Sequence, residues 1–552
     1  MLTVLLLIAL VFFLICYKFY GGFLARVFKL DNANKTPAET MYDGVDYCPT
    51  HPAILIGHHF SSIAGAGPIV GPITAAAWFG WLPAYLWCLL GSAFFGGPHD
   101  AGSVIASIRH QGKSVGEVVK VWIGVRGRLL FSWFVVLTLI LIVAVFIQLG
   151  AGSLAADPAV AFAATVYMVL AFIFGICIYR FKMSVRLGTL IMLPFVFGAC
   201  WFGQAYPVFS DPFRMSMETW RFILMGYVVL ASLLPVWLLL QPRDYLSSYF
   251  LYFAVVIGGI GMVFGSFLGS NFEVQLPAFK GLVQGDTNFI WPILFVTVAC
   301  GAISGFHSMV GSGTTSKQLR KETDSILIGY GSMLLEGMVA VIAIGAVMIS
   351  GNVASGGPVV TFAEGFGKFG SLVGIDPLLG TSMGALAVNT FILTTVDTAT
   401  RLTRYQIQEL SNYKIDKYLA TFIAVAGASV FLFVKTGDRP TWAVIWPVFG
   451  AANQLVASLA LLAVAVWVKK AFARSNAFLM APMWFMMVTT IAALGLLVYG
   501  ELVAAQSNFV VVVFSVVLII LAILMLREAL AALANRTESG VGLKGRPKSE
   551  TA

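Results

Sequence analysis

Apolar runs of about 20 residues recur along the whole chain, and short polar segments separate them. A helix of that length crosses a hydrocarbon core about 30 Å thick, so each run is predicted to be a transmembrane helix. The pattern therefore predicts an all-α integral membrane protein with about 15 transmembrane helices. They are expected at residues 2–24, 53–80, 82–97, 129–151, 158–179, 187–207, 221–240, 246–270, 288–316, 325–350, 377–400, 418–435, 442–468, 478–500 and 507–526.

Two of the predicted spans are interrupted near their midpoints. Span 53–80 contains Ala-Gly-Ala-Gly-Pro at 64–68, and span 288–316 contains Gly-Ala-Ile-Ser-Gly at 301–305. Glycine weakens a helix interior, and a proline that follows glycine favours the end of one helix and the start of the next. Both spans are therefore predicted to be discontinuous helices.

The two discontinuous helices are expected to run in opposite directions, because six complete spans lie between them. Each one opens a block of helices, the first over 53–270 and the second over 288–468. Matched breaks, opposite direction and similar block size are typical of the inverted repeats of secondary transporters. The remaining parts are an N-terminal transmembrane helix within 1–28, C-terminal helices within 478–526, and a tail at 527–552 that we expect to be disordered, basic and cytoplasmic.

Composition supports the membrane assignment, since 59% of the 552 residues are hydrophobic and only 11% are charged. The net charge of +9 follows from topology, because alternate loops hold 28 of the 34 Lys and Arg residues. The positive-inside rule makes these loops cytoplasmic and places the N-terminus outside and the C-terminus inside. No nucleic-acid partner is therefore expected. One such loop, 98–128, mixes apolar and basic residues and predicts a short helix on the cytoplasmic surface.

The breaks point to an anion-binding site. Unwound backbone needs polar partners within a membrane, so each break is expected to face the interior of the bundle. Free N–H groups from Ile69 onward and near Phe306 begin the second half-helices, and such N-termini attract carboxylates, whereas the unwound carbonyls favour a cation. The predicted substrate-binding residues are His58, His59, Ser61, Ser62, Gly65, Gly67, Pro68, Ile69, Gly305, Phe306, His307 and Ser308.

Two other interpretations of these motifs fit less well. GAGPIVG at 65–71 follows no predicted strand and lacks the Gly-Lys-Ser/Thr ending of a phosphate-binding loop. A metal could gather His58, His59, His99, Asp100 and His307, yet adjacent histidines on a helix point about 100° apart and no pair has HxxxH spacing. The six cysteines stand singly. The sequence therefore predicts no metal site and no resident cofactor, and packing remains the alternative role of each single histidine.

Acidic residues within apolar spans are costly and so informative. Glu336 has no positive residue within ten positions, and we predict that Glu336, His59 and Asp100 take part in proton coupling, with a structural hydrogen bond as the alternative for Glu336. Asp397 lies near a cytoplasmic helix end, where Arg401 at i+4 predicts an ordinary ion pair. Residues expected either to line the cavity or to join helices by polar packing are His99, Asn389, Thr394, Thr395, Asp397, Asn453 and Gln454.

Five long motifs carry a resemblance to a known family. They are GHHFSSIAGAGPIVGP, LPAYLWCLLGSAFFGGPHDAGS, ACGAISGFHSMVGSGTTSKQL, LTTVDTATRLTRYQIQE and WPVFGAANQL, and the match extends from about residue 25 to about residue 470. In this order they resemble the carbon starvation protein A (CstA) family of bacterial inner-membrane transporters. The family's patterns fall on His59 and Phe60, on Gly65, Gly67 and Pro68, on His99 and Asp100, and on Gly305, Phe306 and His307, whereas the additional His58 looks like a local variant.

The resemblance implies a LeuT-like fold of the amino acid–polyamine–organocation superfamily, with peptides or pyruvate as substrates and coupling to protons. We therefore expect a secondary active transporter that imports a small carboxylate, pyruvate first and short peptides second, in the response to carbon starvation. Protons are the expected co-transported ion and sodium the alternative. The expected partners are the substrate and the lipid bilayer; no catalytic residues are predicted, and the sequence does not determine the oligomeric state. The alternative of another class is a membrane sensor or an intramembrane metalloprotein.

Overall fold

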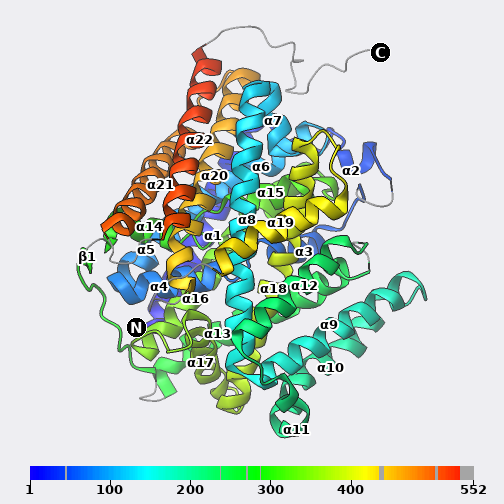
Figure 1. Cartoon of the computed structure of the whole chain (residues 1–552), viewed down its shortest axis with the longest axis vertical. Coiled ribbons are helices and arrows are strands. Elements are labelled where there is room, and N and C mark those ends of the chain that lie inside the picture. The colour runs from blue at the N-terminus through cyan, green and yellow to red at the C-terminus, as the bar shows by residue number, and fades with distance from the viewer. Residues whose placement is uncertain are drawn as a thin grey trace.

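The computed structural model describes residues 1–43, 47–235, 238–268, 272–285, 288–433, 441–503 and 508–534 (Figure 1). Helices dominate these ranges, and the only named strands in them are the antiparallel pair β1 (Val283–Gln284) and β2 (Asn288–Phe289). The all-α prediction is confirmed. The tail predicted for 527–552 begins later than expected, because the last helix continues to Ala534, and residues 535–552 lie outside the described ranges.

The helices follow one another through short connections. In the first half they are α1 (Leu2–Val27), α2 (Pro37–Thr40), α3 (Pro52–Ile63), α4 (Gly67–Phe79), α5 (Trp81–Gly91), α6 (Gly97–Arg109), α7 (Val115–Trp122), α8 (Val125–Ala156), α9 (Pro158–Tyr179), α10 (Val185–Ala205), α11 (Pro207–Ser210), α12 (Met217–Leu233) and α13 (Leu240–Leu268). In the second half they are α14 (Phe295–Thr297), α15 (Gly305–Gly313), α16 (Ser332–Ser350), α17 (Pro358–Ser371), α18 (Pro377–Leu410), α19 (Lys417–Leu432), α20 (Thr441–Phe472), α21 (Ala477–Val503) and α22 (Phe509–Ala534).

Ten helices in the described ranges are long and apolar enough to cross a membrane, or up to 11 if the bent pair α3 and α4 forms one span. The predicted number of 15 is therefore not confirmed. The other four predicted spans are helical but short or interrupted. The helix α12 ends at Leu233, before Pro235, and α19 has 16 residues. The helix α5 passes through a π-helical turn (Ser92–Gly96) into the more polar α6, and span 288–316 is broken.

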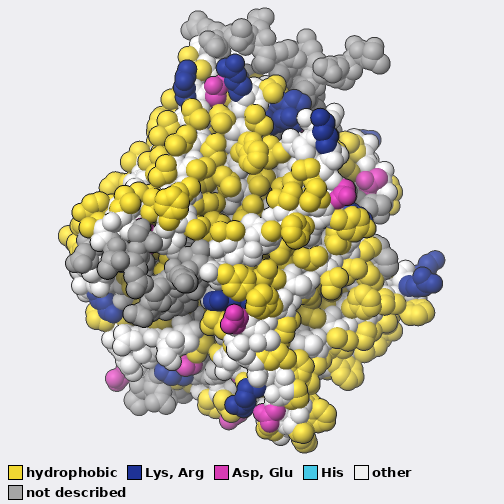
Figure 2. Space-filling model, in the orientation of Figure 1, with side chains coloured by type: hydrophobic (Ala, Val, Ile, Leu, Met, Phe, Trp, Pro, Cys, Tyr) yellow, Lys and Arg dark blue, Asp and Glu magenta, His cyan; other side chains and the backbone are white. Residues whose placement is uncertain are grey.

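The helix α8 forms the central post of the bundle. It runs vertically through the molecule in Figure 1 and packs against α12, α18, α19, α20 and α22. The helices α9 and α10 pack on each other and extend from the bundle at the lower right of the same view. Hydrophobic side chains cover most of the middle of the face in Figure 2, with several Lys and Arg side chains at its upper end. This apolar belt is what contact with lipid requires.

Both predicted helix breaks are confirmed. The helix α3 ends at Ile63 and α4 begins at Gly67, and the two are bent by 48°. In the second break the chain is non-helical from residue 298 to 304, between α14 and α15. This break is longer than the predicted 301–305, and Gly305 is already the first residue of α15.

The two breaks lie directly against each other. A Cβ atom placed on Gly67 would meet Cys300 Cβ and Sγ at 2.4 Å, and one on Gly71 would meet the Thr297 carbonyl oxygen at 2.5 Å. Gly301 lies in turn against Pro68 and Pro72. Glycine at position 67 therefore allows an approach that no other residue permits. Segments more than 200 residues apart in the sequence form a single unwound region within the bundle.

Two segments differ from their sequence predictions. Residues 98–128 form a surface helix only in part, because every residue of α6 is buried, whereas the short helix α7 buries one face and exposes Lys120 and Val121. The helix α17 was not predicted, since its glycines and its 14-residue length hide it between two spans. It packs against α13, α16 and α18. The burial of α6 matters for function because it brings His99 and Asp100 into the interior.

The contact between the breaks predicts opposite effects of glycine substitutions. Gly67→Ala is expected to lower the free energy of unfolding by roughly 1–3 kcal/mol, because the added methyl group overlaps Cys300. Gly198→Ala and Gly226→Ala are matched controls on α10 and α12, where a Cβ atom meets nothing within 4 Å. They should be neutral or stabilising, since alanine favours helix over glycine by about 1 kcal/mol. Thermal unfolding in detergent measures all three, and a Gly67→Ala protein as stable as the controls would contradict the contact.

Candidate functional site

Two adjacent histidines before the first break face different parts of the interior. The His58 Nδ1 atom lies 3.8 Å from Asp244 Oδ2 on α13. The His59 Nδ1 atom shares a hydrogen bond of 2.7 Å with Thr315 Oγ1, which follows α15. Successive residues on a helix point about 100° apart, so a pair on α3 can reach two clusters at once. We name these the acid–histidine cluster and the arginine cluster.

The acid–histidine cluster consists of His99, Asp100, His307 and Glu336, which come from α6, α15 and α16. Asp100 Oδ1 lies 2.7 Å from His99 Nδ1, and Asp100 Oδ2 lies 2.8 Å from His307 Nδ1. His307 Nε2 lies 3.3 Å from Glu336 Oε2. All four side chains are at most 1% exposed. The predicted candidates His307, Asp100 and Glu336 are thus brought together, although 236 positions separate Asp100 from Glu336.

The contacts of His307 allow one proton to be shared between its Nε2 atom and Glu336. An ionised Asp100 accepts hydrogen bonds, so the Nδ1 atom of His307 carries a hydrogen and a neutral ring presents the Nε2 lone pair to Glu336. A hydrogen bond between Nε2 and Oε2 then needs a proton on one of the two atoms. Both Glu336 oxygens have no hydrogen-bond partner among the described residues. A charged carboxylate in such a place costs several kcal/mol unless a proton or cation neutralises it.

A metal ion is the other species that this cluster could hold. One sulfur, one nitrogen and one oxygen, from Cys300, His307 and Glu336, lie within 4.8 Å of one another. Sulfur, imidazole and carboxylate donors suit zinc and related transition metals. The sequence prediction of no metal site took no account of Cys300, because the second break alone brings it to the cluster.

The arginine cluster lies on the opposite side of α3. Arg243 Nη2 donates to Asp244 Oδ1 at 3.0 Å, and Arg243 Nη1 donates to the Tyr227 hydroxyl at 2.9 Å and contacts Asp397 Oδ2. The Tyr227 hydroxyl donates to Asp397 Oδ2 at 2.5 Å. The Arg243 side chain is fully buried, and both carboxylates are 1% exposed. The cluster joins α12, α13 and α18 beside the first break.

The predicted ion pair of Asp397 with Arg401 is wrong. Asp397 pairs with Arg243, whereas Arg401 Nη2 donates to the carbonyl oxygens of Ala231 and Leu234 at 2.9 and 2.8 Å. Spacing of i+4 allows a pair but does not compel one. Here α13 brings Arg243 to Asp397, and the end of α12 presents the backbone carbonyls that accept hydrogen bonds from Arg401.

Most of the predicted anion donors at the breaks already have partners. The N–H groups of Ile69 and Val70 donate to the Ala66 carbonyl at 3.1 and 2.9 Å. The Phe306 N–H donates to Asn453 Oδ1 at 2.9 Å. The prediction of a free amide at Phe306 is therefore wrong. The hydroxyls of Ser61, Ser62 and Ser308 donate to backbone carbonyls, as hydroxyls within helices commonly do.

The polar residues predicted to line a cavity or join helices mostly join helices. Asn453 and Gln454 hold the second break, since Gln454 Nε2 donates to the carbonyls of Phe295 and Val298 at 2.8 and 3.2 Å. Asn389 donates to Ser153 Oγ at 2.6 Å, and Thr394 donates to the Thr390 carbonyl. Thr395 faces the first break, where a Cβ atom on Gly65 would lie 2.6 Å from its hydroxyl oxygen.

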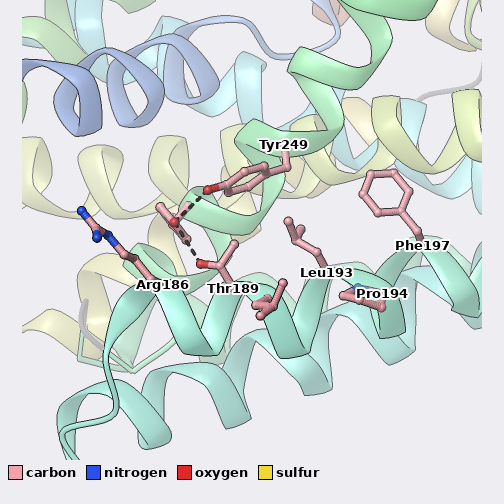
Figure 3. Close-up of a pocket in the computed structure, with 8 residues that line it drawn as sticks. Arg186, Thr189, Leu193, Pro194, Phe197 and Tyr249 are labelled. Atoms are coloured by element: carbon pink, nitrogen blue, oxygen red, sulfur yellow. Dashed lines mark hydrogen bonds between the residues drawn. The ribbon is translucent and has the colours of Figure 1, made fainter.

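The space around the breaks is nearly closed. A cavity of about 10 Å³ lies beside Phe306 and Asn453, which is about the volume that one water molecule needs. A larger groove of about 540 Å³ runs along α10 and α13. Figure 3 shows Arg186 and Thr189 at one part of it and Leu193, Pro194 and Phe197 along it. None of the predicted substrate-binding residues lines this groove, and the breaks are occluded in this conformation.

Comparison with known proteins identifies the family. The family described as "Carbon starvation protein CstA" matches residues 1–354 and 345–493. The chain belongs to this CstA family. It is 34% identical to the peptide transporter CstA of Helicobacter pylori, over 82% of this chain and 75% of that protein. It is 31% identical to the pyruvate/proton symporter BtsT of Escherichia coli, over 88% of this chain and 80% of that protein. This member of the CstA family is a multi-pass membrane transporter.

Solved structures similar to this CstA-family chain include two mutant forms of the manganese transporter of Eremococcus coleocola. One has a TM-score of 0.46 and 10% identity and covers 87% of this chain and 94% of its own. The other has a TM-score of 0.47 and 9% identity and covers 90% and 98%. At this level the likeness carries no argument about repeat topology, so the LeuT-like arrangement, the inverted repeats and the division into blocks stay predictions.

Sequence reasoning missed Arg243, Asp244, Tyr227 and Cys300. Arg243 and Asp244 directly precede an apolar run, and the sequence therefore placed them in a cytoplasmic loop with the other basic residues. The available signal was the Arg-Asp pair itself, since a neutral pair can extend a membrane helix where a single charge cannot. Tyr227 and Cys300 gave no signal, because both residue types are ordinary within apolar spans.

Loss of Asp100 is expected to be strongly destabilising. Asp100→Ala removes the shared partner of His99 and His307 and should lower the free energy of unfolding by about 3–5 kcal/mol. Asp211→Ala is the control, since it breaks an ion pair with Arg214 in which both side chains are more than half exposed, and such pairs contribute about 0–1 kcal/mol. Thermal unfolding of both variants in detergent decides the matter, and equal melting temperatures would refute the proposed arrangement.

Proposed function

We propose that this protein imports a small carboxylate across the bacterial cytoplasmic membrane by proton symport, with pyruvate as the leading substrate and short peptides as the second. The observation that carries this proposal is the pair of histidines on α3: His58 lies 3.8 Å from Asp244 of the arginine cluster, and the adjacent His59 hydrogen-bonds Thr315, which follows the helix α15 that carries His307 of the acid–histidine cluster. A symporter needs two linked sites, one for the substrate and one for the ion, and we assign these roles to the two clusters. It is proposed to act as a carrier and not as an enzyme.

Alternating access follows from the packing of the breaks. The paired breaks are the least regular part of the bundle, and Gly67 against Cys300 allows them to touch. Rocking of one group of helices against the other opens the site to each side in turn, while the residues at the break stay near the middle of the membrane. The occluded conformation is one state of this cycle. We propose that the C-terminus lies on the cytoplasmic side and the N-terminus outside, because the positive-inside rule assigns to the cytoplasm the loops that hold 28 of the 34 Lys and Arg residues.

The proton is proposed to reside between Glu336 and His307. Their 3.3 Å separation and the tautomer imposed on His307 by Asp100 make this pair a one-proton site. His59 joins α3 to Thr315, which follows the helix α15 that carries His307. A monovalent anion entering against a membrane potential of 100 mV is opposed by about 2.3 kcal/mol, and one co-transported proton removes that term. Sodium held by oxygen atoms at the breaks is the alternative coupling ion.

The relatives' names support a carboxylate as substrate. Peptides and pyruvate, named for the relatives from Helicobacter pylori and Escherichia coli, share a carboxylate group. The fully buried guanidinium of the arginine cluster is the group in the described chain that we propose for a carboxylate. Relatives at 30–34% identity are named for both substrates, and we rank pyruvate first and short peptides second.

A metalloprotein is the second candidate, on the strength of Cys300, His307 and Glu336 lying within 4.8 Å of one another. It makes a distinct prediction: the purified protein would contain about one equivalent of zinc or a related metal per chain. Elemental analysis of protein purified without chelators gives the answer. Cys300→Ser should remove the metal if the three donors bind one, and should leave proton-driven uptake in place if they serve a proton.

Proteoliposome uptake is the test of the symport proposal. Labelled pyruvate and a labelled dipeptide are offered under an imposed inward proton gradient, and then under a sodium gradient alone. Glu336→Gln should reduce gradient-driven uptake at least roughly tenfold, since the amide cannot take up or release the proton. His59→Ala should reduce it as well, because it removes the hydrogen bond that ties α3 to the end of α15.

Glu364→Gln is the matched control, because Glu364 lies on an exposed position of α17. It is expected to keep the parent rate. Uptake that depends on the sodium gradient and not on the proton gradient would identify sodium as the coupling ion. Uptake that responds to neither gradient would contradict symport, and uptake of the dipeptide alone would make peptides the substrate.

A further inference from the structure

We propose that the Arg243 guanidinium is the group that binds the substrate's carboxylate, in competition with the two aspartates that now hold it. The inference rests on the proposed function and specifies its substrate site. A guanidinium presents a planar fork of donors that matches a carboxylate with two parallel hydrogen bonds, which an ammonium group cannot do. In the resting conformation Asp397 and Asp244 occupy part of that fork.

The other expected anion donors point away from this role. The Phe306 N–H is capped by Asn453, and the Ile69 and Val70 N–H groups donate to Ala66. A carboxylate bound at either helix end would have to displace backbone hydrogen bonds that close the breaks. Arg243 is the fully buried cationic side chain of the cluster that His58 of α3 reaches through Asp244. An anion that enters this cluster can exchange with the aspartates that hold the guanidinium.

The hydrogen bonds of the arginine cluster are incomplete. Arg243 Nε, Asp397 Oδ1 and Asp244 Oδ2 are buried and have no hydrogen-bond partner among the described residues. Buried polar atoms of native proteins nearly always have partners, so three unpaired atoms in one cluster indicate a place that a polar ligand completes. The unpaired Nε–H lies on the edge of the guanidinium that Nη2 shares, so a carboxylate that pairs with Nε and Nη2 competes there with Asp244, while Asp397 contacts Nη1.

The cluster is joined to the break and has one partly open side. The Ser61 hydroxyl contacts the Asp244 carbonyl at 3.4 Å, which ties α3 to the start of α13. The His58 side chain is 20% exposed, whereas those of Arg243, Asp244 and Asp397 are at most 1% exposed. Entry on the His58 side would bring a substrate first to an imidazole and then to the guanidinium. Movement of α3 at the break would change the distance between them.

Charge balance explains why binding of the substrate's carboxylate at Arg243 needs a second ion. One arginine faces two aspartates, so the cluster already carries an excess negative charge when both are ionised. A substrate carboxylate adds another negative charge and competes with Asp244 and Asp397 for the same guanidinium. Binding is therefore favourable only when a positive charge enters with the anion, which is the linkage that symport requires.

Direct binding of labelled pyruvate to the purified, full-length protein tests the proposal. Arg243→Lys keeps the positive charge but loses the fork, and it should weaken pyruvate binding roughly tenfold or more. Asp397→Asn removes one competing carboxylate and should strengthen pyruvate binding, an effect that a merely structural role of Arg243 does not produce. Competition with unlabelled pyruvamide, which lacks the carboxylate, should be at least roughly tenfold weaker than competition with pyruvate in the parent protein.

The matched controls are Arg109→Lys and Glu322→Gln. Arg109, at the end of α6, and Glu322, in a turn before α16, form another buried arginine–carboxylate pair, and both variants should keep the parent affinity. Pyruvate affinity unchanged within twofold in Arg243→Lys and Asp397→Asn would overturn the assignment of Arg243, while gradient-driven uptake by the parent would leave the transport function standing. Failure of the parent to bind pyruvate or a dipeptide would overturn both. If Arg243→Lys does not fold, the opposite shift in Asp397→Asn still decides.

Discussion

An unwound backbone inside a membrane must find hydrogen-bond partners within the protein, and this requirement organises the centre of the molecule. Lipid offers no donors or acceptors, so each break needs partners from neighbouring helices. Asn453 and Gln454 of α20 supply side-chain amides to the second break, and Ser92 donates to the Gly301 carbonyl at 3.0 Å. The first break packs onto the second through Gly67 and Cys300. The surrounding helices are held where they can serve these groups.

The same interior concentrates charge. Glu336, Asp100, Asp244, Asp397 and Arg243 are all essentially inaccessible to solvent, and an isolated charge there would be costly. Each is placed beside an opposite charge or an imidazole, yet each cluster keeps unpaired atoms. Such incomplete networks are stable only with a ligand, a proton or a change of conformation. A transporter depends on this property, because an interior whose polar groups all have partners would gain no hydrogen bonds by binding a ligand.

The clusters are linked through one short helix. His58 and His59 are neighbours on α3, and the helical geometry alone turns one towards α13 and the other towards α15. The residue that begins the break, Ala64, follows within two turns. Any rotation or tilt of α3 therefore moves both contacts together. This is a physical basis for coupling the movement of an anion to that of a proton.

Local signals predicted a large part of this arrangement. Glycine and proline in the middle of apolar runs predicted both breaks, since backbone conformation depends on neighbouring residues. An acidic residue within an apolar span predicted a functional role for Glu336, because the cost of burying charge is independent of the fold. Asp100 was expected in a polar segment, and the burial of α6 brings it to His307 beside Glu336. The predicted number of 15 spans is not confirmed. Predicted spans fall short where helices end early, as at Leu233, or continue into a π-helical turn, as at Gly91. Those endings depend on packing against other helices.

The sequence by itself determined that the chain lies in a membrane, that two of its helices are broken, and that carboxylates and histidines are present at membrane depth. Only the tertiary structure decided which of these groups meet. Asp397 had a suitable partner four residues away in Arg401 and instead pairs with Arg243, which lies 154 positions earlier. Cys300 lies beside the acid–histidine cluster because helix packing brings the second break to it. Partners of this kind are selected by helix packing, and contacts between distant helices leave no periodic trace in the chain.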